Sequence, residues 1–256
     1  MIDQRAIIDP TARIAQNVTI GPWSIIGENV EIGEGTWIGP HVVIAGPTRI
    51  GRDNKIFQFA SVGSDPQDKK YGGEKTSLEI GDRNVIRECV TISRGTVQGG
   101  GVTRIKDDNL FMAYVHIAHD CNVGSNTIFA NNASLAGHVK VEDFVILSGF
   151  AAVHQFCVIG AHSFVAKSSM VVKDVLPYIL ISGFEATTCG INTEGLKRRG
   201  FSSETINILR RAYKVIFRQG LTVQQAIPQL QEMALECAEV QPLIDSLSHS
   251  ERGIVR

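Results

Sequence analysis

A six-residue repeat runs through most of this chain and limits the folds that the chain can adopt. Hexads that begin with Ile, Val, Leu or Phe fill residues 8–67, 80–97 and 105–176, which makes 25 hexads in a sequence of 256 residues. The fifth residue is Ala, Val, Ser, Thr or Cys in 21 of them, and the four exceptions are Asn54, Pro66, Asn84 and Asn109. A period of six matches neither an amphipathic helix nor a simple alternating strand.

A triangular prism explains this period. Each hexad then forms a short strand and a corner, and three hexads close one coil of 18 residues. The aliphatic first residue points into the prism, and the small fifth residue fits the narrow interior beside it. Coils stacked about 4.8 Å apart let the backbone amides pair with the coil above or below. The sequence therefore predicts an all-β parallel β-helix, in which residues 18 apart lie in one column.

Two stretches interrupt the repeat. Residues 68–79 and 98–104 are polar and rich in glycine. We expect both to leave the prism as loops, which in solenoids commonly carry function. A simple tolerated insertion remains an alternative for each of them.

The pattern changes to a helical one in the last quarter of the chain. Ser202 stands where it would cap a helix, and Thr222 and Gln225 have the spacing of a capping box. We therefore predict a β-helix over residues 1–190 and a small helical domain over residues 191–256.

The composition argues against several classes of protein. The 25 basic and 26 acidic residues nearly balance, so we expect no nucleic-acid partner. No apolar stretch approaches the ~20 residues of a membrane span, and the first residues do not resemble a signal peptide. Five widely spaced cysteines without a CxxC pair favour reduced thiols, from which we expect a cytoplasmic location.

Five of the seven histidines lie close together in the sequence, at His116, His119, His138, His154 and His162. In an 18-residue coil, His119 shares a column with Gly137 and Gln155. Asp120 lies one coil from His138. A neutral imidazole can take a proton from a hydroxyl, a carboxylate can orient that imidazole, and a glycine leaves its amide open to an oxyanion. The column therefore indicates base catalysis by His119 with Asp120 and Gly137.

Other uses of these histidines remain alternatives. Polar residues prefer the corners of a solenoid, which would make each histidine a surface residue. Zinc requires three converging ligands with an open position, and the histidine spacings of 3, 19, 16 and 8 do not match the zinc sites of such prisms. We therefore predict no metal and no cofactor. A metal-dependent enzyme on the same prism and a non-catalytic scaffold stay open.

Several motifs resemble one family of hexapeptide-repeat acyltransferases over essentially the whole chain: QFASVG, QDKKYGGE, IGDRNVIRE, RGTVQGGG, HIAHDC, NNASLAGHV, AVHQFCVIGAHS and NTEGLKRRGFS. The family is that of the acyl-carrier-protein–UDP-N-acetylglucosamine O-acyltransferases, and another acyltransferase of the hexapeptide-repeat fold stays an alternative. The resemblance implies a left-handed β-helix and a homotrimer with its sites between neighbouring prisms. It also implies transfer of an R-3-hydroxyacyl group from acyl carrier protein to the 3-hydroxyl of UDP-N-acetylglucosamine, the first step of lipid A biosynthesis.

The resemblance further implies roles for individual residues. His119 would be the general base, Asp120 its partner and Gly137 the donor to the oxyanion. The substrate-binding residues that it implies are Asp68, Lys70, His116, His138, His154, Gln155, Asn192, Glu194 and Arg198. We expect His119 of one subunit to meet Asn192 or Arg198 of another.

The tail carries an excess of positive charge. Residues 192–220 contain seven basic and two acidic residues, on a chain of net charge −1. The basic residues that we assign to a partner surface are Arg210, Arg211, Lys214 and Arg218. A solvated helix face is the alternative, but an acidic acyl carrier protein would be steered by such a patch.

Three places depart from the residues usual in the family. Ser93 replaces a histidine, and Phe184 with Glu185 replaces Gly-Asn. Lys167 stands near the position that measures the acyl chain, often Gly or Met. Its side chain could shorten the hydrocarbon slot or extend outward to solvent, so the sequence does not predict the preferred acyl length.

Overall fold

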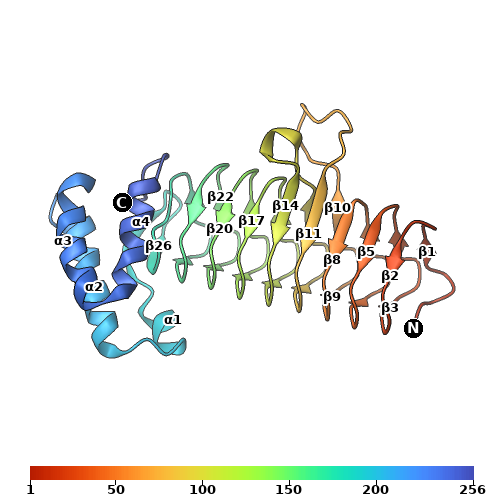
Figure 1. Ribbon diagram of the computed structural model, residues 1–256, viewed down its shortest axis with the longest axis horizontal. Coiled ribbons are helices and arrows are strands. Elements are labelled where there is room, and N and C mark those ends of the chain that lie inside the picture. The colour runs from red at the N-terminus through yellow and green to blue at the C-terminus, as the bar shows by residue number, and fades with distance from the viewer.

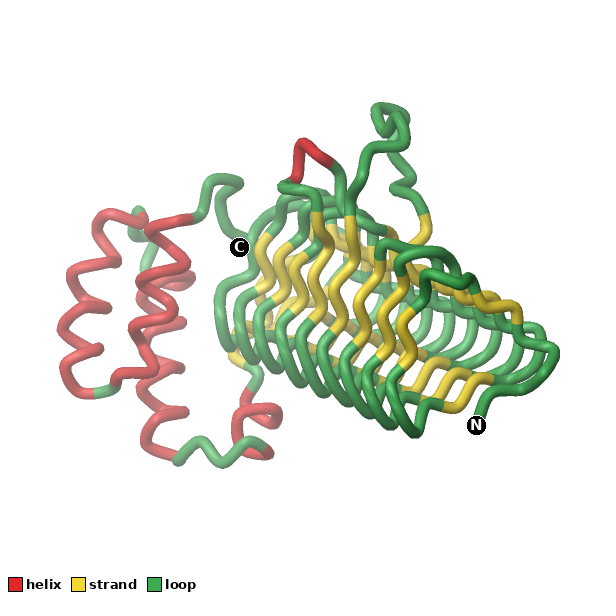
Figure 2. The backbone as a smooth tube through the Cα atoms, turned by 45° about the vertical axis from the view of Figure 1, so that its right-hand side comes forward, coloured by secondary structure: helices red, strands yellow, loops and turns green.

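The computed structural model describes all 256 residues and forms a long triangular prism with a helical domain at one end (Figure 1). The prism is a left-handed parallel β-helix, as the repeat and the family resemblance predict. Its faces are three sheets of short strands, and the chain passes from one face to the next at every corner (Figure 2). The N-terminus lies at the end of the prism away from the helices (Figure 1).

The first face, here called sheet 1, has nine parallel strands. They are β1 (Ile7–Ile8), β4 (Ile25–Ile26), β7 (Val43–Ile44), β10 (Ser61–Ser64), β13 (Thr91–Ser93), β16 (His116–Ile117), β19 (Ser134–Leu135), β22 (Ala152–Val153) and β25 (Met170–Val171). Most successive strands pair in the predicted 18-residue register, as His116 with Ser134. The two loops lengthen this spacing to 30 residues between Ser61 and Thr91 and to 25 residues between Thr91 and His116. Columns of residues 18 apart are therefore real neighbours along the prism.

The second face, sheet 2, has eight strands. They are β2 (Arg13–Ile14), β5 (Val30–Ile32), β8 (Thr48–Ile50), β11 (Ser77–Ile80), β14 (Val102–Ile105), β17 (Asn122–Val123), β20 (Lys140–Val141) and β23 (Val158–Ile159). Its outward residues are mostly charged. We call the edge where the chain passes from sheet 1 to sheet 2 the 1–2 corner. The edge between sheets 2 and 3 is the 2–3 corner, and the edge between sheets 3 and 1 is the 3–1 corner.

The third face, sheet 3, has ten strands. They are β3 (Thr19–Ile20), β6 (Trp37–Ile38), β9 (Lys55–Ile56), β12 (Val85–Ile86), β15 (Leu110–Phe111), β18 (Ile128–Phe129), β21 (Ile146–Leu147), β24 (Phe164–Val165), β26 (Ile179–Ser182) and β27 (Thr187–Ile191). The last strand pairs antiparallel to its neighbour and ends the sheet. The hexads thus cease to form coils at this end.

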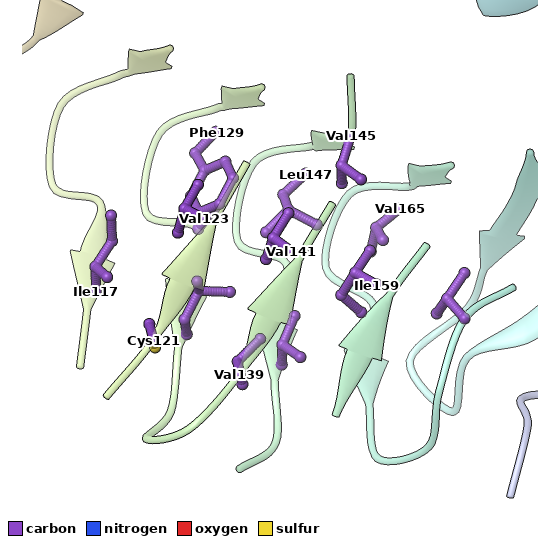
Figure 3. Packing of buried hydrophobic residues seen from close by; sticks show 14 of the residues in the cluster. Ile117, Cys121, Val123, Phe129, Val139, Val141, Val145, Leu147, Ile159 and Val165 are labelled. Carbon is purple, nitrogen blue, oxygen red and sulfur yellow. The ribbon is translucent and has the colours of Figure 1, made fainter. Parts of the chain in front are cut away.

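The interior of the prism is filled by the residues that the repeat predicts. First-place residues such as Ile117, Val123 and Phe129 are fully buried, and fifth-place Cys121 and Val139 fill the space between them (Figure 3). Burial of such a side chain contributes about 1.5–3 kcal/mol, so the stack of coils has a continuous hydrophobic core.

Three of the exceptions at the fifth place form a hydrogen-bonded ladder inside the 2–3 corner. The Asn84 amide donates to Oδ1 of Asn54 at 2.9 Å, and the Asn109 amide donates to Oδ1 of Asn84 at 3.0 Å. The Thr127 amide continues the ladder to Oδ1 of Asn109 at 2.8 Å. These polar side chains are tolerated in the interior because each one satisfies a backbone donor of the next coil. The fourth exception, Pro66, lies in a loop beyond β10.

Most corners contain a residue in the left-handed backbone conformation. Twenty residues other than glycine have positive φ, and all of them except Tyr178 are fourth residues of hexads. This conformation costs about 1–2 kcal/mol for a residue with a Cβ atom. Stacking between coils offsets part of the cost, because Trp23, His41 and Phe59 place their rings 5.1 and 5.5 Å apart in one column.

Two loops leave the prism at the same corner, the 1–2 corner, on successive coils (Figures 1 and 2). The first loop spans residues 65–76 between β10 and β11. The second spans residues 94–101 between β13 and β14 and contains the short 3-10 helix η1 (Val97–Gly99). Both loops therefore stand above the corner that carries the histidines.

The predicted bounds of these loops, 68–79 and 98–104, extend too far toward the C-terminus. Residues 77–79 belong to β11 and residues 102–104 belong to β14, and these two strands pair over four residues. The backbone hydrogen bonds of that pairing keep both segments in the prism.

The helical domain follows β27 directly and covers the end of the prism (Figure 1). Its elements are α1 (Thr193–Arg198), α2 (Ser203–Arg218), α3 (Val223–Glu236), η2 (Ala238–Val240) and α4 (Gln241–His249). Ser202 caps α2, and Thr222 and Gln225 form the predicted capping box of α3. No helix has the length and apolar character that a membrane crossing demands.

Candidate active site

His119 and Asp120 follow β16 at the 1–2 corner and form a hydrogen-bonded pair. Nδ1 of His119 lies 2.7 Å from Oδ2 of Asp120. A carboxylate only accepts hydrogen bonds, so the proton of the neutral ring lies on Nδ1 and the lone pair on Nε2. The Asp120 side chain is 1% exposed and that of His119 is 14% exposed. His119 is therefore the member of the pair that reaches the surface, with its basic nitrogen uncommitted.

Gly137 lies against the His119 ring, as the 18-residue column predicts. A Cβ atom at Gly137 would stand 2.6 Å from Cε1 and 2.8 Å from Nε2 of His119, closer than any side chain tolerates. The amide of Gly137 donates no hydrogen bond within the chain, whereas the next amide, that of His138, donates to the His119 carbonyl at 3.0 Å. Only glycine at this position leaves the ring in place beside an open N–H.

Two further histidines flank this pair. The His138 ring meets His119 edge to face with 5.1 Å between centroids, and it stacks on Phe156 at 4.4 Å. His116 lies on the outer face of β16, where its Nδ1 is 2.7 Å from the hydroxyl of Thr91. Burial lowers the pKa of both His116 and His138, and the charge of His119 acts in the same direction. For His138 the charge of Asp120 opposes this effect without reversing it. The rings of His116 and His138 are thus neutral near pH 7, the state in which an imidazole accepts protons.

A metal ion is the alternative use of this cluster. His119, Asp120 and His138 offer ligand atoms within 4.8 Å of one another. Both oxygens of Asp120, however, already accept hydrogen bonds from the chain, one of them from the His119 ring itself. The carboxylate therefore fits the role of a hydrogen-bond acceptor that orients His119 better than that of a ligand.

Thr96 is a site residue that sequence reasoning missed. The repeat places it at a fifth position of a hexad, which predicts a small interior side chain. In the structure it begins the turn of the second loop, and both its amide and its hydroxyl donate to Asp120, at 2.7 and 2.6 Å. The motif RGTVQGGG was a family signal, but its spacing from Asp120 could not reveal this contact because a loop intervenes.

The first loop brings Asp68 toward the site. Its charge acts to raise the pKa of His138, in the direction opposite to burial. Oδ1 of Asp68 accepts the backbone N–H of Lys70 at 3.0 Å, and the Lys70 side chain is exposed. Arg94 anchors the start of this loop, because its guanidinium donates a hydrogen bond to the carbonyl of Gly63 and pairs with the carboxylate of Asp65.

His154 and Gln155 extend the same wall by one coil. Both side chains are exposed, and Gln155 stands two coils from His119 in its column. Nδ1 of His154 lies 3.4 Å from the guanidinium of Arg252, near the C-terminus. The structure thus places His116, His119, His138, His154 and Gln155 along one corner of the prism.

The other residues predicted to bind substrate lie elsewhere on the chain. Asn192 caps α1, and its amide group donates to the carbonyl of His162 at the 2–3 corner. Its side chain is buried by these contacts, whereas Glu194 and Arg198 are exposed and Glu194 pairs with Lys197. These residues do not meet His119 within one chain.

The residues that depart from the family pattern have different surroundings. Ser93 is buried at the end of β13, and Phe184 is 75% exposed next to exposed Glu185 in the turn before β27. Lys167 is exposed at the 3–1 corner after β24. Lys167 therefore extends away from the core of its own prism.

The four basic residues assigned to a partner all lie on the exposed side of α2. Arg211 is engaged in an ion pair with Glu236 of α3 at 3.3 Å. Arg218 donates to the hydroxyl of Tyr213, and Arg210 bonds Asn207. The charges of Arg210, Lys214 and Arg218 therefore remain free for a partner, since only Arg211 is paired with a carboxylate.

Comparison with known proteins extends these observations. Residues 174–255 match the family profile described as "Udp N-acetylglucosamine O-acyltransferase; Domain 2", and residues 29–64 match the bacterial transferase hexapeptide profile. The fold and the site thus define a hexapeptide-repeat transferase.

Full-length relatives narrow this class. The acyl-[acyl-carrier-protein]–UDP-N-acetylglucosamine O-acyltransferase of Janthinobacterium sp. (strain Marseille) is 56% identical over 260 residues, which cover 100% of this chain and 99% of the relative. Solved UDP-N-acetylglucosamine acyltransferases from Moraxella catarrhalis and Francisella novicida both superpose with a TM-score of 0.98, at 48% and 46% identity. The alignments cover all of this chain and 99% and 94% of those chains. The chain belongs to the family of acyl-[acyl-carrier-protein]–UDP-N-acetylglucosamine O-acyltransferases.

Proposed function

We infer that His119 is the general base with which this chain performs the reaction of its family. The chain transfers an R-3-hydroxyacyl group from acyl carrier protein to the 3-hydroxyl of UDP-N-acetylglucosamine, in the first step of lipid A biosynthesis. The observation that carries the role of His119 is its geometry: Nδ1 is bonded to buried Asp120, and Nε2 is free beside the open amide of Gly137.

The proposed mechanism follows from these three groups. The sugar hydroxyl gives its proton to Nε2 of His119 while its oxygen forms a bond with the thioester carbonyl carbon. Asp120 stabilises the imidazolium, and the amide of Gly137 donates to the oxyanion. When the tetrahedral intermediate collapses, the C–S bond breaks and the thiol leaves with the proton from His119. Base catalysis of this kind contributes about 100- to 10,000-fold.

We further propose that the working unit is a homotrimer. The outward residues of sheet 3 form an apolar stripe of half-buried side chains: Leu110, Ile128, Ile146 and Phe164. The 3–1 corner exposes large aromatic rings, those of Trp23, Phe59, Tyr114 and Phe150. The outward residues of sheet 2, by contrast, are mostly charged. Three copies that gather their 3–1 corners around one axis cover the apolar surfaces and leave sheet 2 in solvent.

This arrangement would complete the site. Around such an axis, sheet 1 of one copy faces sheet 3 of the next. The 1–2 corner with His119 then lies across a cleft from the 2–3 corner of the neighbour, where α1 holds Asn192, Glu194 and Arg198. We propose that these residues bind substrate together with Asp68, Lys70, His116, His138, His154 and Gln155 of the first copy. A Phe164→Glu variant should then lose both its assembly, by sedimentation, and its activity.

We propose that acyl carrier protein docks on α2 and that the enzyme works in the cytoplasm. The free basic residues of α2 complement an acidic partner, and all five cysteines are unpaired thiols. Arg210→Glu should raise the KM for acyl carrier protein at low salt and leave the KM for the sugar nucleotide unchanged. An unchanged KM for the carrier would contradict this docking surface.

One assay tests the central assignment. Thioester consumption with UDP-N-acetylglucosamine and carriers that bear hydroxyacyl chains of increasing length should show a preferred chain for the wild type. His119→Ala should lose at least about 100-fold in kcat while its circular dichroism stays native. A chelator should leave the wild-type rate unchanged, since loss of activity would favour the metal-dependent alternative. Full activity of His119→Ala would refute the role of His119.

A further inference from the structure

Asp120 is held by more contacts than a partner of His119 requires. Oδ1 accepts the amide of Thr96 at 2.7 Å, and Oδ2 accepts the Thr96 hydroxyl at 2.6 Å. The same Oδ2 accepts Nδ1 of His119 at 2.7 Å. Its own backbone amide donates to the hydroxyl of Thr103. The carboxylate is therefore fixed in orientation by three donors, two of which come from Thr96.

The second loop is shaped to bring Thr96 to this carboxylate. The Thr96 carbonyl accepts the amides of Gly99 and Gly101, which closes the turn over the corner. Gly99 packs so closely that a Cβ atom there would stand 2.0 Å from Cγ of Asp120. Glycine at 99 is thus required by the close approach of the loop to the carboxylate.

The base of this loop is anchored independently of the site. Arg94 is buried and bonds the carbonyl of Gly63 at 2.6 Å, the carboxylate of Asp65 and the hydroxyl of Tyr71. Thr96, only two residues further along, is 2% exposed. The position of its hydroxyl is therefore set by the prism and the first loop, and not by a mobile loop tip.

We propose that Thr96 is a positioning residue of the acyl transfer, which sets the orientation and the charge of Asp120 and thereby the basicity of His119. This proposal rests on the inferred role of His119 as general base. Thr96 acts only through Asp120. Its two hydrogen bonds compensate the buried negative charge, and they keep Oδ2 directed at Nδ1 of His119 when the ring becomes an imidazolium.

The consequence for pH has a definite direction. Without the Thr96 hydroxyl, the charge of Asp120 is less compensated and attracts the proton of the imidazolium more strongly. The ring of His119 then keeps its proton to higher pH and is less available as a base at pH 7. The other titratable groups that face this ring are His116 on β16, His138 on the next coil and, beyond His138, Asp68 from the first loop.

The test compares Thr96→Val with Thr96→Ser in the full-length enzyme. Valine keeps the volume and the amide but removes the hydroxyl. We expect kcat at pH 7 to fall about ten- to a hundredfold, as for the loss of a hydrogen bond to a charged group. The KM for UDP-N-acetylglucosamine should stay the same, and the acidic limb of the pH profile of kcat/KM should move to higher pH. Thr96→Ser should restore both the rate and the limb.

A matched control separates this role from a structural one. The Thr127 hydroxyl is also buried and donates to Oδ1 of Asn109 at 2.7 Å, at a different corner. Thr127→Val should lower the melting temperature by about as much as Thr96→Val does, but it should not move the pH profile of kcat/KM. Gly99→Ala, which pushes the loop off Asp120, should reproduce the effect of Thr96→Val.

The possible failures are distinguishable. If His119→Ala is inactive while Thr96→Val has the rate and the pH profile of the wild type, the role of Thr96 is refuted and the general base stands. If Thr96→Val loses activity with an unmoved acidic limb, and serine does not restore it, Thr96 is structural and the proposal is also wrong. If His119→Ala is active, the mechanism itself fails.

Discussion

His138 and His162 occupy equivalent places in the repeat and have different surroundings. Both are fourth residues of hexads with left-handed backbone, at φ values of 63° and 59°. Each ring stacks on a phenylalanine one coil away, His138 on Phe156 at 4.4 Å and His162 on Phe144 at 4.7 Å. Local conformation and stacking are therefore the same at both positions.

The other side chains around the two rings differ. His138 stands at the 1–2 corner with His119 at its edge, and its Nε2 lies 3.7 Å from Oδ2 of Asp120. His162 stands at the 2–3 corner, enclosed by Tyr178 and Phe201, and its Nδ1 is buried without a partner.

Burial lowers the pKa of His162 to about 4, and the charge of Arg199 acts in the same direction. The comparison teaches that the repeat fixes where a ring lies, while the coils and loops around it decide its chemistry.

The largest effect on the rate is expected from a methyl group added at Gly137, and Gly149, at the equivalent place of another hexad, serves as its control. Gly137→Ala forces the His119 ring away from its position, and a displacement near 1 Å costs about 100-fold in rate. Gly149 has the same third place in a hexad at the 3–1 corner, where a Cβ atom would meet only the carbonyl of Asn131 at 3.4 Å. Gly149→Ala should keep the activity and the size of the assembly in steady-state kinetics and gel filtration. Equal losses in both variants would remove the distinction between the corners.

A smaller effect should separate the two histidines themselves. We expect His138→Gln to raise the KM for UDP-N-acetylglucosamine about tenfold, the typical weight of one hydrogen bond to substrate, with little change in melting temperature. His162→Gln removes a ring from an enclosed aromatic stack, so it should cost about 2 kcal/mol of stability and leave kcat unchanged. Steady-state kinetics and thermal unfolding of both variants check that His138 acts in substrate binding and His162 in stability. An unaltered KM in His138→Gln would remove His138 from the binding site.

The smallest effect is a pH dependence of stability at the 2–3 corner. The pKa of His162 lies near 4 in the folded chain and about 6.5 in an unfolded one, so the unfolded state takes up the proton first. The free energy of unfolding that is linked to His162 is therefore at its full value above about pH 6.5 and falls as the pH falls toward 4. Because the ring is partly exposed, we expect on the order of 1 kcal/mol. Denaturant unfolding of wild type and His162→Phe between pH 7 and 4.5 measures it, and identical pH dependence in both would contradict it.

Much of this molecule could be predicted because a repeat of six converts sequence spacing into distance. The 18-residue coil placed His119 against Gly137 and Asp120 near His138, and the structure has both neighbours. Helix starts such as Ser202 were equally predictable, because a cap is a local hydrogen bond.

The remainder depended on contacts that spacing does not encode. The three asparagines of the interior broke the rule of small fifth residues, and only their mutual hydrogen bonds explain them. Asn192 matched a substrate-binding position, yet in its own chain it is buried as the cap of α1. Thr96 fitted the repeat as an interior residue, although the chain had already left the prism there.

By itself, the sequence determined the prism, its register and the column of polar residues on one corner, since a periodic pattern of aliphatic side chains has one way to be buried on every coil. Only the tertiary structure decided which residues of the two loops contact that corner. Two loops of irregular sequence fold back over it, and the close approach of Thr96 and Gly99 to Asp120 depends on long-range packing that no period describes.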